Sequence, residues 1–559
     1  NAEGRGLLDH LFDGDLGRSE MPIGITGDPE LDRARFLHRG LGRRLRKERS
    51  QRNRETSGEK RLTGNFLHGG FLGWETNQCN PRFVFMCPRK SRGTDHSFLY
   101  FRAQLKSDTP HPKKIVQMMK RRKFLQSSGS TLAVAGVPTL LRGKNLNSVI
   151  QLAAIGTEAR GWADLEAMAN HPKTKPVAFC DVDLKRTSKA KKLNPDAPVY
   201  QDFREMLEKE GDKIDAVTIG IPDHMHAIAT VDALRRNKHV FCQKPLTHTV
   251  WEARQVRLQA EKSGVITRMG NQIHSHGFYR TAVKLVQSGA IGKVRRVHSW
   301  INATGHGKSG QIGRITPCAP HDGLAWDLWL GVAPTRPYVE GKVYHPWGWR
   351  DWQDFGNGAL GDFGCHVLDP VFSALQIELA PTQIKCSMHT GMNDEVWPAQ
   401  STVEYDFPGT PFSQKSLPIT WNDGGKQPRD LGPHFNRRHA LPGGGSIFIG
   451  ETGSLVLPHV GSPKLYPEEK FKGFAYDRMV NLNHFHGWLD GIVENRQPSD
   501  GFSYAGPLTE TVLLGTAAMR SLGEHLSWDA KTMKLTSSAG DRSDLLTKEY
   551  RKGWEIKPV

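Results

Sequence analysis

The chain has 559 residues, of which 37% are hydrophobic and 24% charged, and its formal net charge is +18. One hydrophobic core rarely serves a chain of this length, so we expect two or three folded units with an ordinary globular composition. The positive charge is concentrated in residues 1–117, with 22 Lys and Arg against 14 Asp and Glu, and in residues 118–147, with 6 against none. The remaining chain is nearly balanced, which excludes a nucleic-acid-binding role based on a basic folded surface.

Residues 1–117 are rich in Arg, Gly and Ser and show no sustained strand-like or helix-like hydrophobic period. This composition predicts a disordered segment or upstream sequence that was wrongly translated. A basic arm that binds nucleic acid is the alternative interpretation, but no aromatic side chains interleave the charged run from Arg43 to Arg54.

Residues 118–147 join two arginines, Arg121 and Arg122, to an apolar stretch. The run KRRKFLQ resembles the S/T-R-R-x-F-L-K pattern of twin-arginine export signals, and the apolar stretch is too short to span a bilayer. We therefore expect the biological start at Met118 or Met119, export to the periplasm or cell envelope, and no stable membrane insertion. If the signal does not stand at the true N-terminus, we expect a cytoplasmic protein.

Residues 148–270 alternate short apolar strands with helical stretches. This alternation requires right-handed crossovers and predicts a parallel, doubly wound sheet of the Rossmann type. The expected strands after the first are VAFCDVD, AVTIG and HVFCQ (Val177–Asp183, Ala216–Gly220 and His239–Gln243), and the expected helices are DFREMLEKE and HAIATVDALRR (Asp202–Glu210 and His226–Arg236).

The first strand runs into a loop that resembles a dinucleotide-binding fingerprint. The sequence SVIQLAAIGTEARG keeps Gly156 for the tight turn and Gly161 for close packing of the following helix. Glu158 replaces the middle glycine, and two like charges about 4 Å apart repel by roughly 1 kcal/mol in water or roughly 4 kcal/mol at an effective dielectric constant near 20. Thr157 and Arg160 complete the loop, and all five residues are expected to bind the cofactor.

Two further features bear on the cofactor. Asp181 lies 20 residues after Gly161, where a carboxylate takes the adenosine ribose hydroxyls and repels a 2'-phosphate, so the sequence favours NAD over NADP. The Glu158 carboxylate has two possible directions. Turned outward, toward Arg160, it leaves the pyrophosphate to Gly156 and the helix N-terminus, whereas turned inward it impairs cofactor binding.

The sequence changes in texture after about Gly270. Strand-like stretches with partial alternation are separated by long loops rich in Gly, Pro and Trp. This pattern predicts a second, α+β domain over residues 271–559, built on a large and mostly antiparallel sheet. Its expected strands include KVRRVHSWI, STVEYDF and SLVLP (Lys293–Ile301, Ser401–Phe407 and Ser454–Pro458).

Four separated motifs carry a more specific resemblance. They are FCQKPLTHT after the third of the strands named above, WDLWLGVAPTRP (Trp326–Pro337), WRDWQDFGNGALGDFGCHVLDP (Trp349–Pro370) and FSYAGPLTETVLLG (Phe502–Gly515). In this order they resemble the glucose-fructose oxidoreductase, inositol dehydrogenase and MocA family (Gfo/Idh/MocA), from Ser148 to near Val559. The resemblance implies an NAD(P)-dependent oxidoreductase that acts on the CH–OH groups of carbohydrates or polyols and assembles as a dimer or tetramer.

The resemblance assigns catalytic residues position by position. The family's E-K-P lysine, which lies beside the nicotinamide and the reacting hydroxyl, corresponds to Lys244, and Gln243 stands where the family has glutamate. The family's D-x-x-x-H pair corresponds to Asp362 and His366, which share one helix face at this spacing. Histidine is suited to remove the hydroxyl proton. Asp362 would then orient the substrate or stabilise the imidazolium, and Lys244 would hydrogen-bond the developing alkoxide.

Other contacts are predicted around these residues. The loop IPDHMH is similar to a family loop near the cofactor, and capping of the next helix is the simpler role for its Asp223. Cofactor contacts are predicted for Pro222, His226, Gln243 and Lys244. Substrate contacts are predicted for Asn271, Trp349, Arg350 and Trp352. Flat aromatic rings suit a sugar ring, with burial in a core as the alternative for the aromatic residues.

The sequence predicts no metal site. Two histidine pairs, His224 with His226 and His484 with His486, have ligand-like spacing, but neither has a third and fourth partner nearby. The seven cysteines contain no C-x-x-C pair, which argues against a zinc site or a disulfide framework.

We therefore predict an exported, NAD-dependent oxidoreductase that transfers hydride between a carbohydrate or polyol hydroxyl and a nicotinamide. A redox-assisted glycoside hydrolase of the same family is one alternative. A non-catalytic carbohydrate-binding protein with impaired cofactor binding is another, supported by Glu158 and Gln243 and opposed by Lys244, Asp362 and His366.

Overall fold

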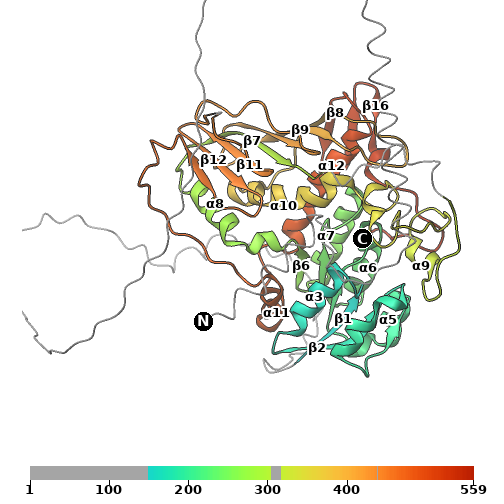
Figure 1. The fold of residues 1–559 in the computed structure, drawn as a ribbon. Coiled ribbons are helices and arrows are strands. Elements are labelled where there is room, and N and C mark those ends of the chain that lie inside the picture. The colour runs from blue at the N-terminus through green and yellow to red at the C-terminus, as the bar shows by residue number, and fades with distance from the viewer. Residues whose placement is uncertain (1–148, 304–315, 437) are drawn as a thin grey trace, which may run out of the picture. The chain divides into compact units, whose positions relative to one another are not determined.

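The computed structural model describes residues 149–303, 316–436 and 438–559 (Figure 1), which belong to one compact unit, Leu140–Val559. The predictions made for residues 1–117 and 118–147 lie outside the described residues. None of the helices in the described ranges combines the length and apolar content needed to cross a membrane.

The first sheet has six strands in the order β3-β2-β1-β4-β5-β6, and every neighbouring pair is parallel. This confirms the predicted Rossmann sheet, whose strand order reverses between β1 and β4 and opens a crevice at the carboxyl ends. The strands are β1 (Ile150–Ile155), β2 (Thr174–Cys180), β3 (Val199–Tyr200), β4 (Ala216–Ile219), β5 (His239–Gln243) and β6 (Thr267–Gly270).

Side chains along β1 alternate between two hydrophobic clusters, which shows that both faces of this sheet are covered. Ala153 and Ile155 join the larger core, and Leu152 and Ala154 join a smaller one on the other face. The helices between the strands are α3 (Arg160–Ala169), α4 (Ser188–Leu193), α5 (Phe203–Lys209), α6 (Asp223–Arg235) and α7 (Val250–Ser263).

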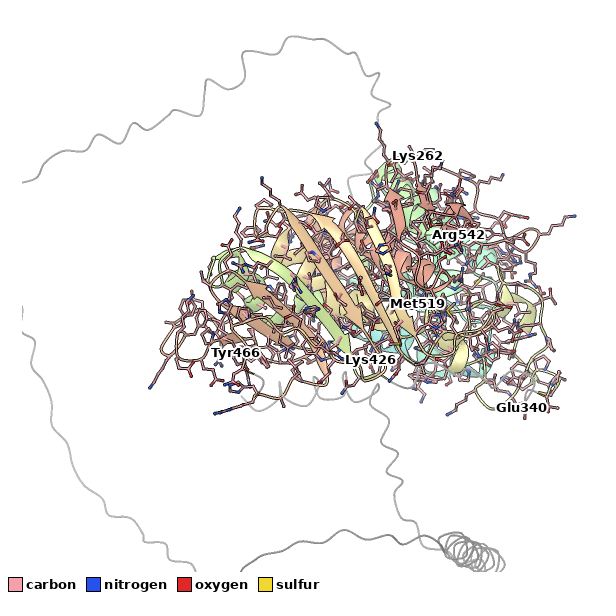
Figure 2. All side chains as sticks on the ribbon, turned by 90° about the horizontal axis from the view of Figure 1, so that it is seen from above. Lys262, Glu340, Lys426, Tyr466, Met519 and Arg542 are labelled. Carbon is pink, nitrogen blue, oxygen red and sulfur yellow. The ribbon has the colours of Figure 1, made fainter. Side chains whose placement is uncertain are left out.

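The second sheet has ten strands, and all neighbouring pairs are antiparallel except β7 with β10. This confirms the predicted mostly antiparallel sheet, whose strands lie side by side in Figure 2. Its strands are β7 (Val294–Ile301), β8 (Gln383–His389), β9 (Ser401–Pro408), β10 (Ser416–Asn422), β11 (Gly444–Gly450), β12 (Ser454–Pro458), β13 (Lys464–Tyr466), β14 (Leu526–Asp529), β15 (Lys534–Ser537) and β16 (Gly540–Asp541).

Two long helices, α10 (Gly358–Leu375) and α12 (Phe502–Met519), pack against each other and against strands of the second sheet. Alternating burial along β9 supplies the apolar face that α12 covers. The shorter helices of this half are α8 (Gly277–Gln287), α9 (Trp326–Leu330) and α11 (His484–Glu494).

The two halves do not separate in chain order as the predicted ranges 148–270 and 271–559 do. Figure 1 shows α11 beside α3, and Trp488 of α11 is buried with Leu152 and Phe241 in the smaller core of the first sheet. Close to the C-terminus, the Val559 amide donates to Gln255 of α7 at 2.9 Å. Late parts of the chain therefore complete the nucleotide-binding half.

Candidate active site

A lysine from the first half meets a carboxylate from the second. Lys244 directly follows β5 at the carboxyl edge of the parallel sheet, and Asp362 lies in the first turns of α10. The Lys244 ammonium donates to the Asp362 carboxylate and to the Asp362 backbone oxygen, both at 2.7 Å. The two side chains are 13% and 16% exposed, so the pair is accessible from the crevice. The fold therefore brings together two residues that the sequence assigned to the site, and their ion pair is a contact that the sequence did not predict.

His366 lies one helical turn after Asp362, as its spacing predicts, and is 8% exposed. Its Nδ1 atom has no hydrogen-bond partner among the described residues. Burial, followed by the positive charge of Lys244 and the neighbouring His459, holds the pKa of His366 well below its usual value. The imidazole is consequently neutral near pH 7, which is the form that accepts a proton.

Two further charged side chains surround Asp362. The Arg350 guanidinium places Nε 3.6 Å from the second Asp362 oxygen, so one carboxylate faces two cations. Asp223 lies near the same group. Burial, reinforced by the Asp362 charge, raises the pKa of Asp223 to about 7.

The expected capping role of Asp223 is wrong. The N-cap of α6 is Pro222, and no side chain caps the helix there. Asp223 is instead the first helical residue, 4% exposed, and its carboxylate accepts a hydrogen bond from Asn357 at 3.3 Å. Because Asn357 directly precedes α10, Asp223 links the two halves of the site.

The glycine loop has the close backbone approach that a dinucleotide site needs. Gly156 has φ +88°, and a Cβ atom there would collide with the Gly220 carbonyl group after β4. A Cβ atom on Gly161 would lie 2.8 Å from the Gly156 carbonyl carbon and 3.0 Å from the Gly220 oxygen. Both positions therefore require glycine, and the N-terminus of α3 is left facing the crevice, where it can hold a pyrophosphate.

The Glu158 carboxylate is paired with Lys189 and not with Arg160. The carboxylate lies 2.7 Å from the Lys189 ammonium, and the two side chains are 23% and 48% exposed. Arg160 instead lies 4.0 Å from Asp164, one turn further along α3. Lys189 lies on a neighbouring helix, and no local sequence pattern links it to Glu158. Only the fold shows that the two residues pair.

Asp181 follows β2 at the carboxyl edge of the sheet, as predicted. Its carboxylate accepts hydrogen bonds from the Thr157 backbone at 3.0 Å and hydroxyl at 3.2 Å, and from the Asp183 backbone at 3.0 Å. These bonds fix the carboxylate beside the glycine loop, where ribose hydroxyls would meet it.

Gln243 faces away from Lys244. Its amide nitrogen donates to the Asp164 carboxylate at 2.7 Å, and Asp164 is fully buried. Burial raises the pKa of Asp164 to about 7, against the opposing effects of Arg160 and Gln243. At position 243, where the family has glutamate, this chain therefore has a neutral amide that donates to a buried carboxyl group on α3.

Two other residues with predicted contacts, His226 and Asn271, are buried and bond to the backbone. His226 is 1% exposed, and its ring nitrogens lie 2.7 Å from the Pro245 oxygen and 2.8 Å from the Ile221 oxygen, which joins the loops after β5 and β4. Asn271 is fully buried, and its amide donates to the Cys365 oxygen at 2.9 Å, beside His366. Both residues position the site from behind and do not line the crevice.

Two of the four predicted substrate contacts are tryptophans, Trp349 and Trp352. Trp352 is fully buried and Trp349 is 8% exposed, and both belong to a cluster with Trp329 and Phe355. They are core residues, the alternative that the sequence left open. Of the four predicted substrate residues, Arg350 is the one placed beside Asp362.

Sequence reasoning missed one histidine at the site. The ring of His459, directly after β12, lies 5.9 Å from the ring of His366 and 6.2 Å from that of Phe363. Its Nδ1 atom lies 2.8 Å from the hydroxyl of the buried Tyr279 on α8. No local pattern marks His459, because only the pairing of β12 with β11 brings it to α10.

The predicted histidine pairs make protein hydrogen bonds. His224 contacts the backbone oxygens of Trp329 and Phe355, and His484 contacts the Met269 oxygen and Ser275 hydroxyl. Within the described part of the chain, no group of three or more His, Cys, Asp and Glu side chains is arranged to hold a metal ion.

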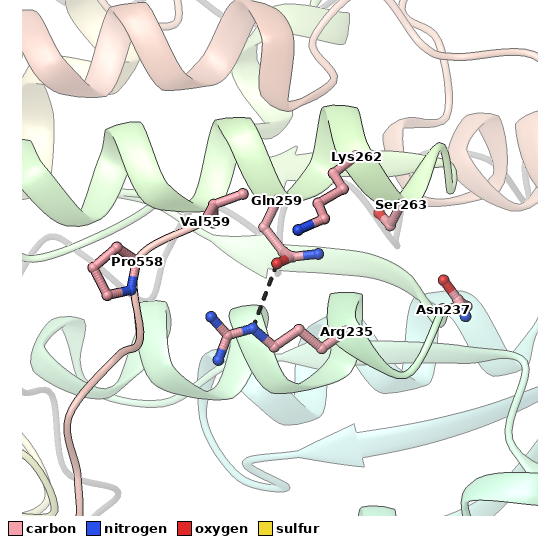
Figure 3. Close-up of a pocket in the computed structure, with 7 residues that line it drawn as sticks. All are labelled: Arg235, Asn237, Gln259, Lys262, Ser263, Pro558 and Val559. Atoms are coloured by element: carbon pink, nitrogen blue, oxygen red, sulfur yellow. Dashed lines mark hydrogen bonds between the residues drawn. The ribbon is translucent and has the colours of Figure 1, made fainter. Parts of the chain in front are cut away.

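A pocket of about 380 Å³ lies elsewhere, where the C-terminal ends of α6 and α7 meet the end of the chain (Figure 3). Arg235 and Gln259 line it, joined by a 3.4 Å hydrogen bond. Asp223 stands at the opposite end of α6, about 20 Å away at the helical rise per residue. This pocket is therefore separate from the candidate active site.

A Rossmann crevice that meets a Lys–Asp–His cluster defines a two-domain, nucleotide-binding oxidoreductase. Sequence comparison agrees: residues 150–271 match the model of an oxidoreductase family with an NAD-binding Rossmann fold, and residues 279–407 match that family's C-terminal alpha/beta domain. Residues 150–271 and 279–407 are thus the two domains of a Gfo/Idh/MocA-type oxidoreductase, and NAD is the cofactor of the first domain.

Curated relatives match a limited stretch. Inositol 2-dehydrogenase of Rubrobacter xylanophilus is 30% identical over 159 residues, which are 27% of this chain and 43% of that protein. The 1-carboxy-3-chloro-3,4-dihydroxycyclo hexa-1,5-diene dehydrogenase of Comamonas testosteroni is 34% identical over 126 residues, 22% of this chain and 30% of that protein. The chain thus matches less than half the length of these relatives.

Solved structures resemble the chain over a longer stretch. The WlbA dehydrogenase of Chromobacterium violaceum, in complex with NADH and UDP-GlcNAcA, has a TM-score of 0.49 at 14% identity, covering 68% of this chain and 96% of that one. GenD2 from gentamicin A biosynthesis, in complex with NAD, has a TM-score of 0.45 at 14% identity, covering 70% of this chain and 99% of that one.

Proposed function

We propose that this oxidoreductase transfers hydride between a secondary hydroxyl of a carbohydrate or polyol and NAD. One observation carries the proposal. The Lys244 ammonium, at the carboxyl edge of the nucleotide-binding sheet, is held at 2.7 Å by Asp362, one helical turn before the neutral His366. These three groups supply a hydrogen-bond donor, a carboxylate and a proton acceptor within one accessible cluster.

The residues can divide the reaction between them. Oxidation of an alcohol releases a proton from oxygen and a hydride from carbon. His366 would accept the proton, because burial keeps its imidazole neutral. An ammonium has three donors, and the bonds of Lys244 among the described residues go to two oxygens of Asp362, so one N–H remains for the substrate oxygen. Asp362 holds that ammonium in place and is available to the imidazolium that forms.

The loop around Gly156 and Gly161, the N-terminus of α3 and the Asp181 carboxylate would hold the dinucleotide. This assignment is supported by the absence of room for a Cβ atom at either glycine and by the position of Asp181 beside Thr157. Bound NAD would supply the hydride acceptor. The Lys189 ammonium offsets the Glu158 charge, which supports cofactor binding over a binding protein without cofactor.

Turnover of a polyol and sugar panel with NAD, followed by NADH absorbance, tests this function. The wild type is expected to form NADH, whereas His366→Gln and Asp362→Asn are expected to lose turnover by at least about 100-fold and to keep NAD binding. NADH formation at wild-type rates in both variants would contradict the assigned roles. Release of an aglycone from glycosides without net NADH would instead indicate the redox-assisted hydrolase.

We also propose that the protein is exported by the twin-arginine route with NAD tightly bound. The supporting features are the Arg121–Arg122 pair in residues 118–147 and the expected scarcity of free NAD outside the cytoplasm. A reporter fused behind residues 118–147 should reach the periplasm, and changing both arginines to lysine should retain it inside. Native protein denatured with acid should release NAD, and protein without nucleotide would contradict the second half of the proposal.

A further inference from the structure

Trp347 is an exposed indole close to the active site. Its exposed fraction is 43%, whereas Trp349 is 8% exposed and Trp352 is fully buried. Tryptophan side chains are largely buried on average, so a half-exposed indole beside reactive groups needs a reason. The buried pair is part of a core cluster, which leaves Trp347 as the member of this run that presents its ring to solvent.

The local structure holds this ring in place. Gly348 packs so closely that a Cβ atom there would collide with the backbone oxygens of Lys342 and Val343. The Arg350 guanidinium lies between two indoles, 4.2 Å from the Trp347 ring and 4.3 Å from the Trp349 ring. Arg350 also donates to the Trp347 backbone oxygen at 3.2 Å. Cation–π contacts of this kind fix the outer ring against the inner, buried one.

The same guanidinium connects Trp347 to the reacting groups. Its Nε atom lies 3.6 Å from Asp362, the carboxylate that binds Lys244. One side chain therefore separates the indole from the position where the substrate hydroxyl would sit. A sugar that reacts at Lys244 and Asp362 would have its next attached ring near Trp347.

We propose that Trp347 forms a second carbohydrate subsite, which takes the sugar ring next to the one that is oxidised. The inference rests on the proposed function and narrows its substrate class to disaccharides and longer glycosides. The C–H face of a pyranose packs on an indole face, and Arg350 occupies the space between this indole and the buried one.

Matched sugars and matched variants test the subsite. The enzyme is assayed with NAD on cellobiose, maltose and lactose, and on glucose and galactose, as wild type, Trp347→Ala and Trp347→Phe. For the best disaccharide, Trp347→Ala is expected to lower kcat/KM about 3- to 10-fold through KM, with Trp347→Phe partly restoring it. The monosaccharide rates should change less than about twofold, since they do not reach the subsite.

Leu379→Ala is the control for loss of an exposed apolar side chain. Leu379 is 64% exposed and follows the end of α10 opposite to Asp362. This variant should match the wild type on every sugar. Equal losses on monosaccharides and disaccharides in Trp347→Ala, or none on either, would overturn the subsite.

Direct binding separates this inference from the proposed function. Calorimetric titration of the same sugars into the protein with NAD requires no turnover. Tighter binding of a disaccharide than of its monosaccharide, lost in Trp347→Ala and kept in Leu379→Ala, supports the subsite even if no NADH is formed. Equal binding of both sugars, or no disaccharide binding, overturns it.

Discussion

The glycine loop and the Lys244 cluster lie at the same edge of the parallel sheet, but different parts of the chain build them. The loop depends on backbone groups, with Gly156 and Gly161 packed against each other and against Gly220. The cluster depends on charged side chains from two halves of the molecule, with Lys244 and Asp362 in direct contact. A backbone site tolerates a changed side chain that points away, whereas a side-chain site does not.

Glu158 and Gln243 are the two departures from the family's pattern. Glu158 replaces the middle glycine of the loop and pairs with Lys189. Gln243 stands where the family has glutamate, and its amide donates to the buried Asp164. Each departure is therefore accommodated by a partner distant in sequence.

The largest effect is expected in the Lys244 cluster, which is built from side chains. Lys244→Met removes the donor for the substrate oxygen and the ammonium that Asp362 binds, so kcat should fall roughly 100- to 10,000-fold with NAD affinity retained. NADH absorbance and NAD titration measure the two quantities. Lys189→Met, which removes an exposed lysine of the loop region, should change kcat by less than about threefold. Similar kcat values in the two variants would show that the reaction does not depend on the Lys244 side chain.

Gln243→Glu tests the buried pair. The new carboxyl group would lie where the amide now bonds Asp164 at 2.7 Å, and two buried carboxyl groups at this distance must share a proton. We expect the free energy of unfolding to fall by about 2 to 4 kcal/mol at pH 8 and by less at pH 5, where both groups are protonated. Denaturant unfolding measures it. The double variant with Asp164→Asn should recover most of the loss, and a stable single variant would contradict the pairing.

Gly161→Ala tests the glycine loop, which is built from backbone groups. Its Cβ atom would clash with the Gly156 and Gly220 carbonyl groups, so we expect a loss of about 1 to 3 kcal/mol in unfolding free energy together with weaker NAD binding. Gly211→Ala is the control, because a Cβ atom there meets no atom within 4 Å. Thermal unfolding and NAD titration of both variants give the result, and equal behaviour would show that the loop is not close-packed.

The contact between α10 and the segment that follows β6 should depend on pH through His274, which lies 2.9 Å from Asp369 of α10. Burial alone would lower the pKa of His274, but the charge of Asp369, its hydrogen bond and the charge of Asp500 together outweigh burial and raise the pKa to about 9. The pKa of His274 is higher in the folded protein than its unfolded value of 6.5, so this group stabilises the folded state fully below pH 6.5. The contribution to the free energy of unfolding is lost as the pH rises to about 9. The wild type should therefore lose more unfolding free energy than His274→Gln between pH 6 and pH 9.5. Parallel curves would exclude the ion pair.

The smallest effect is expected at Glu158. Its ion pair with Lys189 is partly exposed, and such pairs contribute about 0 to 1 kcal/mol. Glu158→Gly should therefore change the NAD dissociation constant by less than about fivefold, measured by calorimetric titration. A gain of 100-fold would show that the carboxylate repels the pyrophosphate, and that the loop does not tolerate this side chain.

Much of the fold was predictable because local patterns and global packing agree. The predicted strand at His239–Gln243 has the observed bounds, and the strand at Ser401–Phe407 is one residue longer in the structure. The helix expected to begin at His226 begins at Asp223, because Asp223 enters the first turn and bonds Asn357. Contacts between residues of the two halves were not predictable, because no local sequence pattern encodes them.

The two sheets and the glycine loop were predictable from the sequence, because strand alternation and motif spacing act over a few residues, and the family resemblance proposed Lys244, Asp362 and His366. The partner of Glu158, the carboxylate that Gln243 meets, the exposure of Trp347 against the burial of Trp352, and the contact of His459 with His366 appear only in the tertiary structure. Side-chain direction depends on partners that the fold brings together from distant segments. The glycine loop therefore has to be judged by its neighbours and not by the one residue that departs from its pattern.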